Sequence, residues 1–200
     1  IQKEKISEFY RYLSICHEII PERLETGEIK LSAPNPDDEA LVYAAKYFGY
    51  EFKDRNDKLG IIYDVYNHLT IEMEILYIIP FTSKRKKMSV IVRDIDGVMK
   101  CITKGADNAI FALCNPTSTT SSSNTKADIN QFSVEGLRCL VIAYKTIDPA
   151  TFIRWKKLYD HANTNLIELE KRKKGLDNSI EELEMEMEKG LTVLGATAIE

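Results

Sequence analysis

Three consecutive apolar segments in the middle of the chain constrain its fold most. Residues 71–79 alternate between polar and apolar side chains before becoming wholly apolar, and residues 88–93 and 98–103 are rich in β-branched side chains. These patterns are typical of β-strands. The last two segments are joined by a short connection that ends in Gly97, which can adopt the positive φ of a tight hairpin. Because so short a turn joins antiparallel neighbours, we expect an antiparallel sheet.

Helical segments are predicted on both sides of these strands. Residues 3–20 carry apolar side chains at helical spacing and stop before a proline. A second helix is predicted from Asn35, a good capping residue, to Gly49, and acidic residues fill its first turn. Residues 137–144 resemble a further strand, and two more helical segments follow Pro149. The chain is therefore predicted to be an α+β protein, with a twisted antiparallel sheet flanked by helices.

The length and composition predict one domain. The chain has 200 residues and is 44% hydrophobic, which is enough for one core of ordinary size. Residues 116–126 are dominated by Ser and Thr and are predicted to form a mobile surface loop. The Glu-rich residues 181–188 are expected to be the solvated face of the last helix. Residues 191–199 have the pattern of one more strand.

The charge balance excludes a partner held by bulk electrostatics. The chain has 27 basic and 31 acidic side chains and a net charge of -4, so we expect no nucleic-acid partner and no direct attraction to an anionic membrane. The four cysteines are isolated, which predicts buried thiols and neither a metal site nor a disulfide framework. The longest apolar run, residues 75–83, is too short to span a membrane. We therefore expect a soluble, cytosolic and monomeric piece of protein.

An aromatic ring and a lysine at the ends of two predicted strands form the first pair of candidate site residues. Phe81 follows an apolar strand and precedes the basic residues 84–87, and Lys104 ends a later strand. The ring can stack on a base, and the lysine can bind a phosphate. The residues alone leave other readings open, because periodicity also fits Phe81 to the core and a Lys-Gly pair is commonly an ordinary turn.

Arg138 and the acidic residues after Asn35 are further candidates. Arg138 opens a buried-looking strand, where a charge normally marks the exposed edge, although a guanidinium group also suits a phosphate. Asp38 and Glu39 lie in the first turn of the predicted helix. Carboxylates at this place can bind a ligand, or they can serve only to stabilise the helix start. The basic residues 84–87 fit a nucleic-acid patch less well, because no aromatic residues are interleaved with them.

Several segments together resemble the nucleotide-binding (N) domain of P-type ATPases, specifically the type-IV group, the phospholipid flippases. The segments with the most similar motifs are Asn35–Val42, Pro80–Val90, Lys104–Asp107, Glu135–Arg138 and Leu191–Glu200. The resemblance covers nearly the whole chain. It implies that residues 1–190 form the N domain. It also implies that residues 191–200 begin a strand that leads back to a phosphorylation domain, which is not part of residues 1–200.

The resemblance implies an ATP site. In that site Phe81 is the ring against which adenine stacks, and Ser83 and Met88 belong to the same motif. Lys104 lines the adenosine pocket and helps to hold the phosphate end. Arg138 is implied to bind the phosphates.

The resemblance also implies a carboxylate near the adenine amino group. Flippases have a Glu where this chain has Asp38, and a small residue where it has Glu39. The shorter side chain of Asp38 reduces its reach, so either carboxylate can fill this role.

The resemblance implies that the chain binds ATP and presents the γ-phosphate to an aspartate in a separate phosphorylation domain. No Asp-Lys-Thr-Gly phosphorylation motif occurs in these residues, so no catalytic residue and no metal ligand is assigned here. Mg²⁺ is expected mainly at the phosphorylation domain. The full-length protein is expected to be a membrane-embedded ATPase that moves phospholipid, with phosphorylation and actuator domains as partners of this one. The alternative is a regulatory or scaffold module of a larger pump-like protein.

Overall fold

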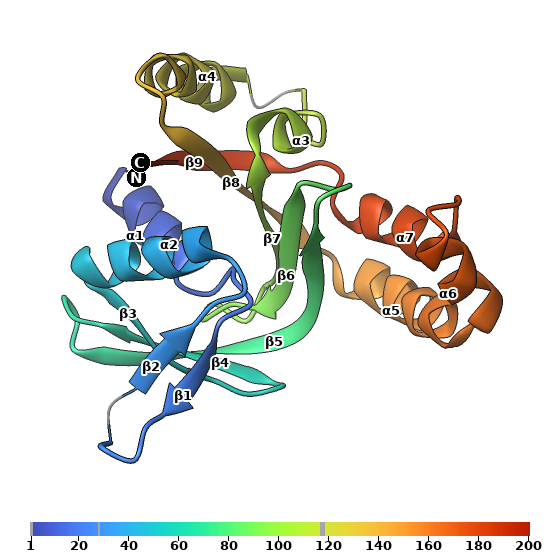
Figure 1. The fold of residues 1–200 in the computed structure, drawn as a ribbon, viewed down its shortest axis with the longest axis horizontal. Coiled ribbons are helices and arrows are strands. Elements are labelled where there is room, and N and C mark those ends of the chain that lie inside the picture. The colour runs from blue at the N-terminus through green and yellow to red at the C-terminus, as the bar shows by residue number, and fades with distance from the viewer. Residues whose placement is uncertain (1, 28, 117–118) are drawn as a thin grey trace.

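The computed structural model describes residues 2–27, 29–116 and 119–200, and in these residues a seven-stranded antiparallel sheet forms the centre (Figure 1). Its strands lie side by side in the order in which they occur in the sequence. They are β3 (Tyr50–Arg55), β4 (Leu59–Asp64), β5 (Leu69–Thr82), β6 (Lys87–Arg93), β7 (Met99–Ala106), β8 (Arg138–Ile147) and β9 (Thr192–Ile199). A separate two-stranded hairpin consists of β1 (Ile20–Arg23) and β2 (Ile29–Ser32).

Helices cover both faces of this curled sheet (Figure 1). They are α1 (Gln2–Leu13), α2 (Pro36–Tyr47), α3 (Asp107–Phe111), α4 (Thr119–Val134), α5 (Pro149–Thr164), α6 (Leu166–Lys173) and α7 (Ser179–Met187). The sheet curls around α1 and α2, whereas α5, α6 and α7 form a group on its other side. The predicted α+β architecture is confirmed. None of the described helices is long and apolar enough to cross a bilayer.

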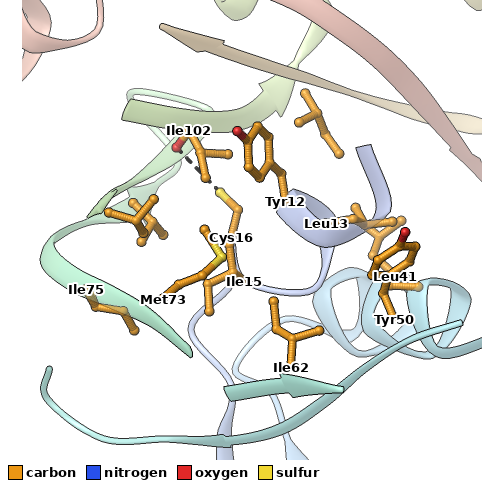
Figure 2. Close-up of a cluster of buried hydrophobic side chains, with 14 of the residues drawn as sticks. Tyr12, Leu13, Ile15, Cys16, Leu41, Tyr50, Ile62, Met73, Ile75 and Ile102 are labelled. Atoms are coloured by element: carbon orange, nitrogen blue, oxygen red, sulfur yellow. Dashed lines mark hydrogen bonds between the residues drawn. The ribbon is translucent and has the colours of Figure 1, made fainter. Parts of the chain in front are cut away.

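The strands β6 and β7 are buried on both faces because two helical layers cover them. Val90 and Ile102 pack in the same cluster as α1 and α2, and Figure 2 shows part of this cluster around Tyr12. Ile91 and Cys101 pack on the other side with α5 and α7. Since successive strand residues point to opposite faces, a continuous apolar run is what such a doubly covered strand requires.

The predicted hairpin and the predicted start of α2 are both confirmed. β6 and β7 pair in antiparallel register, and Gly97 between them has a φ of +78°. Asn35 caps α2, because its side chain accepts a hydrogen bond from the backbone N–H of Asp37. Pro36 occupies the first turn, where a missing N–H costs nothing.

The helix predicted for residues 3–20 ends early. α1 stops at Leu13, and residues 14–19 form an irregular buried connection inside the curled sheet. In this connection the Cys16 thiol donates to the carbonyl oxygen of Ile102, and Arg55 donates to the carbonyl oxygen of His17 at 2.7 Å. Hydrogen bonds to the sheet replace helical ones here, which helical spacing of apolar residues cannot reveal.

Sequence patterns also failed to show β3 and β4. β3 carries several charged residues and is only partly buried, and β4 contains Gly60, so neither strand has a strong β signal. The close packing of Gly60 explains its presence, because a Cβ there would lie 2.0 Å from the Ile15 side chain. Pairing with β5 extends the sheet over strands whose own propensity is weak.

The C-terminal helices differ from the prediction in number and in burial. Three helices follow Asp148, because Gly175 at a φ of +70° and the N-cap Asn178 separate α6 from α7. The expectation that residues 181–188 form a solvated face is wrong for Glu184 and Glu188, which are fully buried. Both form ion pairs with basic residues of other elements. These pairs offset the cost of burying the two negative charges.

The predicted Ser/Thr-rich loop is wrong from residue 119 onward, where the chain forms α4; residues 117 and 118 lie outside the described residues. Ile129 of this helix is buried in a cluster with Val141 of β8 and Val193 of β9. Tertiary burial of this apolar side chain stabilises a helix whose Ser and Thr residues have low helix propensity.

Replacing Ile129 with alanine tests whether α4 is part of the packed fold. Ile129→Ala should lower the free energy of unfolding by about 2–4 kcal/mol, because it leaves a cavity in a closed cluster. Val134 of the same helix is 90% exposed, so Val134→Ala should change the free energy by less than about 0.5 kcal/mol. Urea unfolding of the two variants makes the comparison. Equal and small effects would mean that α4 does not pack on the sheet.

Candidate functional site

A pocket of about 470 Å³ lies where the start of α2 meets the ends of several sheet strands. This volume is in the range of small-molecule sites. The connection after α1, the segment leading into α2, the first turn of α2 and the strands β5, β6, β7 and β8 all contribute to its wall. The lining residues are Glu18, Pro34, Asn35, Pro36, Asp38, Phe81, Met88, Lys104, Gly105 and Leu140.

Phe81 enters the pocket from a bulge in the β5–β6 ladder. The register changes between Ile79, opposite Ser89, and Thr82, opposite Lys87, so one extra residue is accommodated on β5. A bulge of this kind turns side chains away from the regular alternation. Phe81 is 45% exposed, and its backbone N–H donates to Oε2 of Glu18 at 3.2 Å. The ring is therefore an accessible apolar face and not a core side chain.

Lys104 and Asp38 form a buried ion pair in the wall of the pocket. The Lys104 ammonium donates to Oδ1 of Asp38 at 2.6 Å, and Lys104 is only 3% exposed. The backbone N–H of Glu18 donates to Oδ2 of the same carboxylate at 3.4 Å. The pair joins β7 to the first turn of α2. Removing one partner would leave an uncompensated buried charge.

Gly105 lets the β5–β6 turn approach β7 beside Lys104. A Cβ at this position would lie 2.5 Å from the carbonyl oxygen of Lys86 and 2.5 Å from Cβ of Lys87. The register pairs Gly105 with Lys87 and Lys104 with Met88. Glycine is thus required at Gly105 because the backbone of the neighbouring turn takes the space of a side chain.

The structure brings four of the seven predicted site residues into the pocket lining, namely Asp38, Phe81, Met88 and Lys104. Arg138 lies outside the lining but close to it, because its guanidinium group forms an ion pair at 2.9 Å with Asp37, next to Asp38. Glu39 and Ser83 are not among the lining residues. The roles predicted for all seven stay predictions.

Sequence reasoning missed Glu18, Pro34 and Leu140. Glu18 lies in the connection that the sequence assigns to a helix, and no motif marks it as a pocket residue. Leu140 falls within the strand predicted for residues 137–144, and the structure shows that this part of β8 extends beside the pocket. Among the described residues no group of three or more His, Cys, Asp or Glu side chains is arranged to hold a metal ion.

His17 is fully buried behind the pocket wall, next to Glu18. Its Nδ1 accepts the N–H of Ile19 at 3.1 Å, and its Nε2 lies 3.0 Å from the carbonyl oxygen of Ser14. These bonds fit a neutral ring protonated at Nε2. Burial lowers the pKa of His17 well below 6.5, and the positive charges of Arg55 and Lys104 lower it further. Both of these partners are local, and His17 lies in the connection after α1 and not in a helix.

Comparisons with known proteins give one consistent similarity. The family model described as "P-type ATPase, cytoplasmic domain N" matches residues 5–200. The chain is 37% identical over 196 residues to human "Probable phospholipid-transporting ATPase IM", with 98% of this chain and 16% of the relative covered. It is 36% identical over 201 residues to "Probable phospholipid-transporting ATPase 11" of Arabidopsis thaliana, with the same two coverages. For "Phospholipid-transporting ATPase C4F10.16c" of Schizosaccharomyces pombe the identity is 37% over 203 residues, covering 100% of this chain and 14% of the relative.

The buried neutral His17 should make the fold sensitive to acid. The unfolded chain takes up a proton near pH 6.5 and the folded chain does not, so the free energy of unfolding should fall by about 1.4 kcal/mol per pH unit below that value. Urea unfolding between pH 7.5 and 5 measures this slope. His17→Gln should reduce the slope by about one proton. An unchanged slope in His17→Gln would contradict the assignment of a neutral buried ring.

Proposed function

The chain belongs to the family of cytoplasmic N domains of P-type ATPases, within the type-IV group, and we propose that it binds ATP in the pocket between the start of α2 and the strands β5, β6 and β7. One observation carries the proposal. Phe81 and Lys104, which come from separate strands, line the same pocket of about 470 Å³. An exposed ring and a lysine in one cavity are the two groups that a base and a phosphate require.

The adenine base is assigned to the Phe81 side of the pocket. The ring is accessible, and Met88 on the opposite strand lines the same cavity. A base that stacks on an aromatic side chain gains about 1–3 kcal/mol. The flexible thioether of Met88 suits an irregular apolar contact with the base.

The phosphates are assigned to the side of Lys104 and Arg138. Both cations are paired with carboxylates of the α2 start, Lys104 with Asp38 and Arg138 with Asp37. Arg138 is 61% exposed along its side chain, and an exposed ion pair contributes little. Arg138 can therefore exchange Asp37 for a phosphate at small cost, and its guanidinium group can bind the phosphate through two hydrogen bonds.

The function of the full-length protein is part of the proposal, because the chain spans only 16% of the length of the first two relatives. We propose that this domain presents the ATP γ-phosphate to an aspartate in a separate phosphorylation domain. Attack of that carboxylate on the γ-phosphorus would break the bond to the β,γ-bridging oxygen, release ADP and form an aspartyl-phosphate, which divides one difficult step into two. Mg²⁺ would be held mainly at that other domain, where it would supply charge neutralisation at the phosphate. Phospholipid and the membrane are contacted by other parts of the full-length protein.

A carboxylate is also available for the edge of the base. Asp38 is occupied by Lys104, and Glu39 is not a lining residue. Glu18 lines the pocket beside the backbone of Phe81, and within the part of the chain that the structure describes its carboxylate forms no salt bridge. We therefore assign to Glu18 the hydrogen bond from the 6-amino group of adenine.

Replacing Phe81 tests where ATP binds. Phe81→Ala should weaken ATP binding by about 1–3 kcal/mol, because the stacking face is lost, and should leave the thermal unfolding transition nearly unchanged. The affinity is measured by following backbone amide shifts during an ATP titration. Tyr47→Ala is the control, because Tyr47 is a highly exposed aromatic residue of α2 that does not line the pocket. An unchanged affinity in Phe81→Ala would reject the site, and no ATP binding by the unaltered chain would favour the regulatory or scaffold alternative.

Replacing Glu18 tests how the base is recognised. Glu18→Gln should reduce the preference for ATP over inosine triphosphate about tenfold, because a carboxylate only accepts hydrogen bonds while an amide can also donate to the 6-oxo group of hypoxanthine. Competition titrations with the two nucleotides give the ratio. Glu39→Gln removes the same charge from the same end of the molecule but not from the pocket lining, and it should leave the ratio unchanged. A ratio that moves in Glu39→Gln and not in Glu18→Gln would reverse the assignment.

A further inference from the structure

The basic β5–β6 turn packs against α7 through part of its side chains. Lys84 and Lys86 are exposed, whereas the side chains of Arg85 and Lys87 are largely buried. The carboxylates of Glu181, Glu184 and Glu188 lie on one side of this helix and its C-terminal cap, and we call them the acidic face of α7. Lys84 contacts Glu181 at 2.7 Å. The spacing of three and four residues places the three acids above one another on the helix.

Arg85 links the acidic face of α7 to the pocket. Its side chain is 9% exposed, and its guanidinium group pairs with Glu188 and lies 3.6 Å from Glu184. Another nitrogen of the same group donates to the carbonyl oxygen of Pro80 at 3.0 Å. Pro80 directly precedes Phe81, so one guanidinium group holds both the helix and the backbone that carries the stacking ring.

Glu188 also contacts β6, the strand that follows the turn. Its carboxylate accepts a hydrogen bond from the Ser89 hydroxyl at 2.5 Å and forms an ion pair at 3.3 Å with Lys87. Lys87 and Ser89 flank Met88, which lines the pocket. One fully buried carboxylate therefore contacts β6 directly and reaches the end of β5 through Arg85.

The backbone of this turn needs support from outside. Lys86 has a φ of +54°, which is uncommon for a residue with a side chain, and the bulge at Pro80 and Phe81 interrupts the ladder. Such conformations persist where the surrounding structure determines them. The ion pairs of Arg85 and Lys87 with Glu188 supply such support, because they attach the turn to α7.

We propose that Glu188 is a positioning residue for the nucleotide pocket, and that it acts through Arg85 on the backbone at Pro80 and thereby sets the orientation of the Phe81 ring. Glu184 supports the same guanidinium group. This inference rests on the proposed ATP site. It assigns to the C-terminal helices a role in a site to which they contribute no lining residue.

Two variants separate positioning from mere stability. Glu188→Gln keeps the shape of the side chain but removes its charge, and Arg85→Lys keeps the charge but cannot bond α7 and the Pro80 carbonyl with one planar group. Each should weaken ATP and adenosine binding by the same factor, about three- to thirtyfold, because the effect is on the base and not on the phosphates. Glu186→Gln is the matched control, since Glu186 lies on α7 but pairs with Arg154 at the surface.

A double-mutant cycle with Phe81→Ala decides the question. If Glu188 acts by orienting the ring, Glu188→Gln should cause no further loss of affinity once the ring is absent. In the ligand-free chain, the Phe81 amide and Met88 methyl signals should shift in Glu188→Gln and in Arg85→Lys, and not in Glu186→Gln.

Three results would overturn the inference. They are an undiminished affinity in folded Glu188→Gln or Arg85→Lys, a loss of affinity that persists in the Phe81→Ala background, and unshifted Phe81 and Met88 signals. If Glu188→Gln fails to fold, as shown by its thermal transition, Arg85→Lys carries the same cycle. Failure of the unaltered chain to bind ATP would reject the proposed function itself, whereas the signals of the ligand-free chain report on the positioning independently.

Discussion

The antiparallel pairing of β6 with β7 is the constraint on which the other parts of this structure depend. Val90 pairs with Ile102 and faces one helical layer, while Ile91 pairs with Cys101 and faces the other. A shift of one residue would exchange these sets between the two faces. The same register places Met88 opposite Lys104. The packing of both helical layers and the meeting of the two pocket walls therefore follow from one ladder.

Buried charges then attach individual helices to this doubly covered sheet. Asp38 of α2 pairs with Lys104 of β7, and the acidic face of α7 pairs with the β5–β6 turn. At the other end of the sheet, Asp94 accepts contacts from Arg11 of α1 and from Lys100 of β7. An apolar surface alone tolerates many docking positions, whereas a buried charge without its partner is strongly unfavourable. The Lys104–Asp38 pair lies in the wall of the proposed ATP pocket, whereas the acidic face of α7 reaches the pocket only through Arg85 and Lys87.

Local signals predicted those parts of the molecule whose conformation depends on neighbouring residues in the sequence. The hairpin around Gly97 and the capped start of α2 at Asn35 belong to this group. Longer-range effects account for the differences. α4 forms from Ser- and Thr-rich sequence because Ile129 is buried against the sheet, and the predicted first helix ends at Leu13 because the following residues bond to β3 and β7.

The sequence by itself determined an α+β chain with an antiparallel centre, a family, and four residues that line one pocket: Asp38, Phe81, Met88 and Lys104. Motifs and periodicity are sufficient for this, because they record residue types at fixed spacing. Only the tertiary structure decided that Glu18 is part of the pocket, that Asp38 is occupied by Lys104, and that Glu188 lies buried against Arg85. The sequence around a carboxylate does not reveal which cation the carboxylate will contact. Its role depends on which cation the fold brings within reach of it.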